Sequence, residues 1–133
     1  MQINPYLGFN GSCAEAFKFY ETVLGGKITF MMTYAQAPME TPAGWGDKII
    51  HTTLAVGQTV LMGGDAPTDH YRQPAGFSIS IGIEDPTKAT VIFNALAAGE
   101  TITMPLEETF WAKRFGMVTD RYGTPWMVNC GTG

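Results

Sequence analysis

The order of the expected secondary-structure elements constrains the fold of this chain most. Apolar spacing, with glycine and proline at the breaks, predicts strand–helix–strand–strand–strand and then the same order again. The first set is a strand at 3–9, a helix at 13–24 and strands at 27–34, 49–56 and 59–62. The second set is a strand at 77–83, a helix that starts at Pro86 and stops at Gly99, and strands at 101–106, 111–119 and 125–129. Each half is too small to bury a core alone.

The repeat predicts an α+β fold made of two βαβββ modules. We expect the first module at residues 1–64 and the second at 76–133, within a single domain that spans 1–133. Each module would be a curved mixed sheet with its helix on the outside. Two such sheets would enclose a shared cavity.

Local signals mark the ends of these elements. Pro5 indicates a strand start or an edge strand, since proline cannot donate to a ladder. Ser12 and Glu15 have the spacing of a capping box, and Asp85 before Pro86 is typical of a helix start. The remaining breaks are a helix stop at Gly25-Gly26, a loop at 35–47, a two-residue turn at Gly57-Gln58 and a polar connection at 63–76.

Charge and composition exclude several classes of function. The net charge is −4, with Lys113-Arg114 as the one basic cluster, so a nucleic-acid partner is not expected. No apolar run approaches the roughly 20 residues of a membrane span. The start of the chain lacks signal-peptide features, and Cys13 and Cys130 form no disulfide framework, so we expect a cytoplasmic protein.

Several segments resemble one family. They are Pro5–Gly11, Ala16–Tyr20, Val60–Met62, Phe110–Asp120 and Tyr122–Asn129. In them the chain resembles the vicinal-oxygen-chelate superfamily, which includes glyoxalase I and the bleomycin- and fosfomycin-resistance proteins, and within it the PhnB-like branch. The resemblance covers nearly the whole chain. It implies the two-module fold described above and a homodimer.

In the glyoxalase members, four strands hold a divalent metal with His and Glu side chains. The resemblance places these positions here at Asn4, Met62, Ser78 and Met127, and none is a His or a carboxylate. Zinc, nickel and manganese prefer imidazole nitrogen or carboxylate oxygen. We therefore expect no metal site and no other cofactor.

His51 is the histidine with a candidate role. It lies in the strand at 49–56 and shares a face with Thr53 by alternation. One interpretation is a half-buried structural histidine. The other is a polar anchor or general base in a cavity, because imidazole titrates near neutral pH. His70, in the polar loop, is expected to be solvated.

Further candidates come from apolar residues that can line a cavity. The ligand-binding residues predicted in this way, with His51 as their polar anchor, are Tyr6, Met62, Ser78, Trp111, Phe115 and Met127, with Lys113 as a cation for an anionic group. Aromatic and methionine residues on a sheet face also commonly form a core. Lys113 can equally be a solvated residue at a strand end.

These observations lead to two functional hypotheses. The first is a PhnB-like protein that binds a small molecule in a dimer cavity without a catalytic metal. The alternative is a lyase, isomerase or transferase of the glyoxalase superfamily, with His51 as acid or base. The demethylubiquinone methyltransferase label common in this branch finds no support, because Gly8–Gly11 lacks the glycine pattern of a nucleotide-type cofactor fold.

Overall fold

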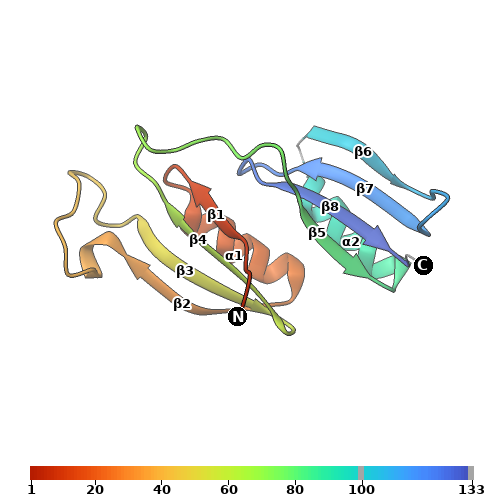
Figure 1. The fold of residues 1–133 in the computed structure, drawn as a ribbon, viewed down its shortest axis with the longest axis horizontal. Coiled ribbons are helices and arrows are strands. Elements are labelled where there is room, and N and C mark those ends of the chain that lie inside the picture. Colours follow the sequence, from red (N-terminus) through yellow and green to blue (C-terminus); the bar gives the residue numbers. More distant parts are fainter. Residues whose placement is uncertain (99–100, 132–133) are drawn as a thin grey trace. The chain divides into compact units, whose positions relative to one another are not determined.

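The computed structural model describes residues 1–98 and 101–131, and Figure 1 shows its elements. The predicted order is confirmed in both halves. The first half contains β1 (Tyr6–Phe9), α1 (Cys13–Leu24), β2 (Lys27–Thr33), a short 3₁₀ helix (Tyr34–Gln36), β3 (Ile49–Val56) and β4 (Thr59–Asp65). The second contains β5 (Ile79–Ile83), α2 (Pro86–Ala97), β6 (Thr101–Glu107), β7 (Arg114–Thr119) and β8 (Pro125–Cys130).

Both halves have the same sheet topology. The strand order is β1-β4-β3-β2 in the first sheet and β5-β8-β7-β6 in the second. The pairs β1–β4 and β5–β8 are parallel, and the other neighbours are antiparallel. The fold is therefore α+β with two mixed sheets, as predicted.

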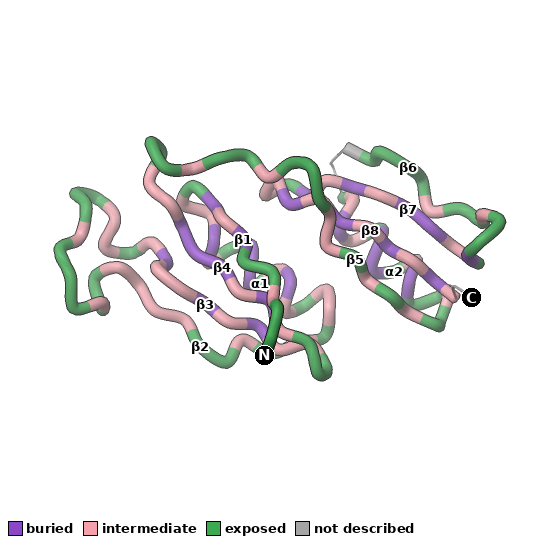
Figure 2. The backbone as a smooth tube through the Cα atoms, viewed as in Figure 1, coloured by how far each residue is buried: buried purple, intermediate pink, exposed green. Residues whose placement is uncertain are grey.

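The chain divides into two compact units, Met1–Arg72 and Gln73–Gly133. In each unit one helix packs against one face of the sheet, and Figure 2 shows buried residues on the helix and the strands it covers. Among the described residues, no helix is long and apolar enough to cross a membrane. The predicted cavity enclosed by the two modules stays a prediction.

Side-chain alternation separates the two faces of the first sheet. Phe9 of β1 makes an edge-to-face contact with Phe17 of α1, at 6.0 Å between ring centroids. Leu7, Leu54 and Leu61 share this covered face and are almost fully buried. The residues between them point the other way, to what we call the α1-distal face.

Strand β4 is longer than the sequence predicted. Gly63-Gly64 was expected to open a loop, but both glycines are paired in the sheet. A Cβ on Gly63 would lie 2.6 Å from the Phe17 ring, and a Cβ on Gly64 would lie 2.8 Å from the Tyr6 hydroxyl. These glycines therefore make room for neighbouring side chains on opposite faces of one strand.

The predicted capping box at Ser12 is wrong. The Ser12 side chain makes no capping hydrogen bond at the start of α1. The Asp65 carboxylate, from the end of β4, accepts hydrogen bonds from the backbone N–H groups of Gly11 at 2.8 Å and Cys13 at 3.0 Å instead. A distant acidic residue therefore holds the helix start, where a negative charge is favourable.

Three other strands begin later than expected. Strand β1 starts directly after Pro5 and lies at a sheet edge, in agreement with the role predicted for this proline. Strand β5 starts at Ile79, after a turn in which Gly76 has a φ of 77°. Trp111 does not begin β7. The Thr109 hydroxyl accepts hydrogen bonds from the backbone N–H groups of Trp111 and Ala112, which forms a local turn before the strand.

The remaining breaks agree with the sequence. Asp85 caps α2 by accepting a hydrogen bond from the N–H of Thr87, with Pro86 in the first turn. Gly25 ends α1 in the left-handed region, and Gly57 turns the β3–β4 hairpin. The stop predicted at Gly99 lies outside the described residues.

Candidate functional site

The α1-distal face of the first sheet carries a cluster of rings around His51. The Tyr6 and His51 rings are stacked, with centroids 5.6 Å apart and planes 22° from parallel. The Phe30 ring comes from β2, which pairs with β3, and its centroid lies 5.8 Å from that of His51. Tyr6 is 52% exposed and Phe30 is 44% exposed, so these rings present contact area to solvent. We call Tyr6, Phe30, His51 and Thr53 the His51 cluster.

Both ring nitrogens of His51 have hydroxyl neighbours. Nδ1 lies 3.3 Å from the Tyr6 hydroxyl, and Nε2 lies 3.3 Å from the Thr53 hydroxyl. The Tyr6 hydroxyl donates to the carbonyl of Ile50 at 3.4 Å. With that proton used, Nδ1–H is the group that donates to the Tyr6 oxygen, and the Thr53 hydroxyl, which can donate or accept, pairs with Nε2. The Tyr6 and Thr53 hydroxyls thus flank the imidazole of His51 on this face.

The environment of Tyr6 keeps its hydroxyl protonated. Burial raises the pKa of Tyr6 above its ordinary value, and the nearby Cys13 and Tyr34 add to the shift. Tyr6 therefore acts as a neutral donor and acceptor at physiological pH. It is not poised as a phenolate base.

The packing around Tyr6 explains its position. Gly64 has no side chain, which lets the Tyr6 hydroxyl approach the sheet. Met62 lies directly opposite Tyr6 in the parallel ladder and opposite Thr53 in the antiparallel one. Three predicted ligand residues of this unit, Tyr6, His51 and Met62, thus share one face of one sheet.

The second unit also places predicted residues on one face. A Cβ on Gly116 would lie 2.7 Å from the Phe93 ring of α2, so Gly116 and its partner Val128 face the helix. Phe115 and Met127 alternate with them and lie on what we call the α2-distal face.

Other predicted residues lie at the margins of the second sheet. Trp111 is 40% exposed in the turn before β7, and its ring meets Phe115 edge to face at 5.3 Å. Lys113 is exposed and its aliphatic stem lies beside Gly131. Ser78 is half-buried and precedes β5. None of these positions tests ligand binding, so the roles remain predictions.

Two residues of these faces were not predicted from the sequence. The sequence predicts only that Phe30 lies in a strand, and its ring contact with His51 depends on the β2–β3 register. The sequence predicts Asn129 at the end of the strand 125–129. Asparagine is depleted in strands, and this was the one available signal.

The residues at the four metal positions of the resemblance do not fit a divalent ion. Met62 and Met127 offer thioethers, and Asn4 and Ser78 offer an amide and a hydroxyl just outside the strands. Within either unit, the described residues bring together no group of three or more His, Cys, Asp or Glu side chains. No chemical step through a metal is therefore derived for this chain.

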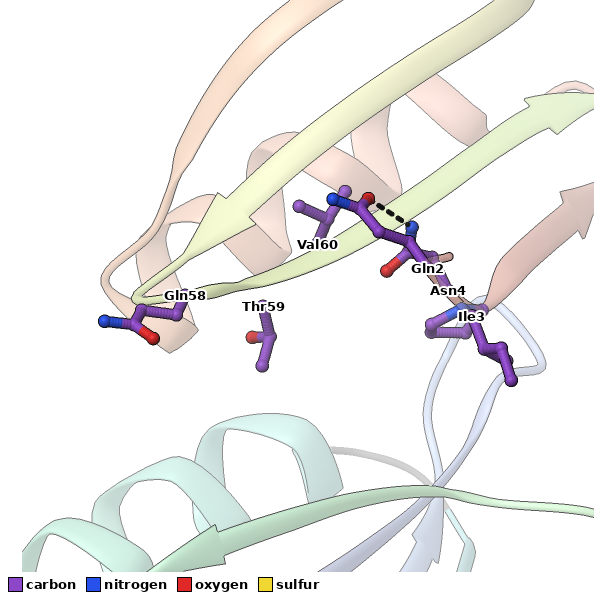
Figure 3. Close-up of a pocket in the computed structure, with 7 residues that line it drawn as sticks. Gln2, Ile3, Asn4, Gln58, Thr59 and Val60 are labelled. Carbon is purple, nitrogen blue, oxygen red and sulfur yellow. Dashed lines mark hydrogen bonds between the residues drawn. The ribbon is translucent and has the colours of Figure 1, made fainter.

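A hollow of about 390 Å³ lies at another edge of the first unit (Figure 3). The segment before β1 and the β3–β4 turn line it: Gln2, Ile3, Asn4, Pro5, Gln58, Thr59 and Val60. The Asn4 side chain donates to Gln2 at 3.3 Å, so this amide is already engaged with a neighbour. The hollow contains no aromatic ring and no charged side chain, and it does not include the His51 cluster.

Cys13 is not an activated thiol. Burial raises its pKa, and the Asp65 carboxylate raises it further. The start of α1 therefore does not lower the pKa of this thiol. Cys13 packs as a small apolar residue, as expected from the sequence, and is fully buried.

Comparisons with known proteins agree with the fold. The profile of the Glyoxalase/Bleomycin resistance protein/Dioxygenase superfamily matches residues 2–128. Protein YjdN of Escherichia coli K12 is 30% identical over 139 residues, which cover 97% of this chain and 95% of that protein.

Two solved structures are similar over their full length. Protein PA1353 from Pseudomonas aeruginosa has 46% identity and a TM-score of 0.92, with 100% of this chain and 99% of that chain covered. The PhnB protein from Bacillus cereus has 25% identity and a TM-score of 0.85, with 98% and 100% covered. With a profile match from residue 2 to residue 128, this chain belongs to the Glyoxalase/Bleomycin resistance protein/Dioxygenase superfamily and has a PhnB protein among its structural neighbours.

Proposed function

We propose that this protein binds a small organic molecule on the α1-distal face, at the His51 cluster, without a catalytic metal. The stacked Tyr6 and His51 rings carry the proposal. Exposed rings offer apolar contact area, and the hydroxyls of Tyr6 and Thr53 offer directional hydrogen bonds. The ligand class that suits this combination is a planar molecule with polar groups at its edge.

Replacing His51 by alanine should weaken such binding about tenfold while changing the melting temperature little. The imidazole lies between the two hydroxyls, and a tenfold loss corresponds to about 1.4 kcal/mol, which is within the range for truncating an anchor residue of a site. The probes are phenol and indole, titrated into ¹⁵N-labelled protein and followed at the amides of Tyr6 and Thr53. His70→Ala is the matched control, because the His70 side chain is 74% exposed and lies beside Asp69 at the surface.

One result would assign His51 a structural role instead. It is a His51→Ala protein that melts several degrees lower but binds the probes with unchanged affinity per folded molecule. Native mass spectrometry of wild-type protein, followed by identification of any co-purified molecule, would then name the natural ligand class directly.

Acid–base catalysis at the same cluster is the second candidate. His51 bridges two hydroxyls at 3.3 Å on each side, so a proton can pass through Tyr6 or Thr53. Because both nitrogens are engaged, His51 would act on a ligand through one of these hydroxyls. Appearance of a product mass from the co-purified molecule would favour catalysis over simple binding.

We also propose that the protein forms a homodimer. Charged residues are 15% of the chain, below the roughly 25% of an average domain. Large apolar side chains are exposed on the edge strands of both sheets, including Phe30 on β2 and Ile102 and Met104 on β6. A partner copy that covers such surface would remove it from water.

Light scattering at micromolar concentration should therefore give twice the chain mass of 14.4 kDa. The matched measurement is the same sample diluted stepwise, which separates a tight dimer from a weak one. A mass of one chain at every concentration would contradict the proposal.

A further inference from the structure

One polar atom in the second unit is buried without a partner. In the described part of the chain, Asn129 Oδ1 is covered from solvent and accepts no hydrogen bond. A buried acceptor left in this state costs about 1–3 kcal/mol, so such atoms are rare in folded proteins. A buried acceptor of this kind can take a hydrogen bond from a bound molecule.

The register places Asn129 on the α2-distal face. It alternates with Val128 and Cys130, which are fully buried on the helix side of β8. Phe115 lies directly opposite it on β7, and Gly82 lies directly opposite it on β5. The amide therefore stands between an aromatic ring and a residue with no side chain.

The space over Gly82 is open. A Cβ built on Gly82 would meet nothing within 4 Å, and its backbone lies outside the left-handed region. Asparagine has a short side chain with a broad second torsion, so a small rotation carries Oδ1 toward this space. A donor placed there would supply the hydrogen bond that Oδ1 lacks.

The surroundings of Asn129 favour a ring-bearing donor. Phe115, which is 8% exposed and has the Trp111 ring against it, forms one side, and Met127 precedes Asn129 by two residues on the same face. Aromatic rings and thioethers make favourable contacts with a planar ligand. No charged side chain is required for this recognition, which suits a neutral N–H or O–H group.

We infer that Asn129 is a ligand-binding residue whose Oδ1 accepts a hydrogen bond from an N–H or O–H group on the edge of an aromatic molecule held against Phe115. The inference rests on the proposed small-molecule function and adds to it a donor requirement. It also adds a second contact surface, on the α2-distal face. The sequence alone did not point to this residue.

The test uses matched probes that differ by one donor: phenol against anisole, and indole against 1-methylindole. Binding is followed at the Asn129 side-chain amide and the Gly82 backbone amide of ¹⁵N-labelled full-length protein. Wild type should prefer each donor probe about tenfold, the effect of one hydrogen bond to a buried acceptor. Asn129→Leu and Gly82→Val should each abolish the preference, the first by removing the acceptor and the second by filling the space.

Stability separates a binding role from a structural one. Asn129→Leu should raise the melting temperature by a few degrees, because an unpaired buried acceptor is replaced by an apolar group of similar size. Asn94→Leu is the matched control, since Asn94 is exposed on α2, and it should keep the probe preference.

Three results would overturn the inference. The first is a lower melting temperature for Asn129→Leu than for wild type. The second is a preference for phenol over anisole, or for indole over 1-methylindole, that survives in this variant. The third is wild-type protein that does not bind the probes at the α2-distal face or binds both members of each pair equally. Binding confined to the Tyr6 and Thr53 amides would overturn the inference and leave the proposed function standing. Binding at the Asn129 and Gly82 amides without binding at the Tyr6 and Thr53 amides would overturn the proposed site at the His51 cluster and leave the inference about Asn129 standing.

Discussion

Replacing Asp65 by alanine is expected to lower the free energy of unfolding by about 4 kcal/mol. The Asp65 carboxylate accepts backbone hydrogen bonds from Gly11, Cys13 and Ile49, at 2.8, 3.0 and 2.9 Å. Asp65 is 4% exposed, so water cannot easily replace these bonds. Each donor left unpaired costs about 1–3 kcal/mol, and the helix start loses a favourable negative charge.

Urea denaturation followed by circular dichroism measures this loss. Asp69→Ala is the matched control, because the Asp69 side chain is 80% exposed and lies beside the similarly exposed His70. It should change stability by less than about 0.5 kcal/mol. Asp65→Asn should fall between the two, since its amide presents a donor to one of the three backbone donors. Equal stability of Asp65→Ala and Asp69→Ala would refute the role assigned to this carboxylate.

The difference between Asp65 and Ser12 shows which parts of the fold the sequence could predict. Element order depends on apolar spacing within a dozen residues, and that order is confirmed throughout the described chain. The start of α1 depends on Asp65, which follows Cys13 by 52 positions. Ser12 has the local spacing of a helix cap. A local pattern cannot reveal that the sheet places the Asp65 carboxylate at the same backbone N–H groups.

Gly63 and Gly64 illustrate the same limit for strands. A glycine pair is typical of a turn, and the sequence therefore predicted a loop there. In the folded sheet the pair is required by the Phe17 ring on one face and by the Tyr6 hydroxyl on the other. Glycine used for close packing and glycine used for a turn look identical in a single sequence.

The candidate site divides in a similar way. Alternation alone placed His51 and Thr53 on one face, and their contact follows from that placement. The stacking of Tyr6 on His51 needs the β1–β4 and β3–β4 registers, which no local pattern specifies. Asn129 is distinguished by a missing partner, a property that exists only once the chain is folded.

Asp120→Ala should destabilise the second unit by about 3–5 kcal/mol, because this carboxylate organises the β7–β8 turn. Its Oδ1 accepts from the N–H groups of Tyr122 at 2.8 Å and Thr124 at 3.0 Å, and its Oδ2 accepts from the Trp126 indole at 2.7 Å. Asp120 and Trp126 are 2% and 1% exposed, so the substitution leaves buried donors that had been satisfied.

A double-mutant cycle with Trp126→Phe isolates the indole bond. Because the two side chains share one buried contact, the combined loss should be smaller than the sum of the single losses by about 1–3 kcal/mol, measured by urea denaturation. Asp85→Ala is the matched control: Asp85 caps α2 from an exposed position, and its substitution should cost only about 1 kcal/mol of stability.

If Asp120→Ala costs no more stability than Asp85→Ala, the buried turn does not depend on the Asp120 carboxylate. A loss several times larger would establish that each unit relies on one buried aspartate, Asp65 in the first and Asp120 in the second, to satisfy backbone groups that its sheet and helix leave unpaired.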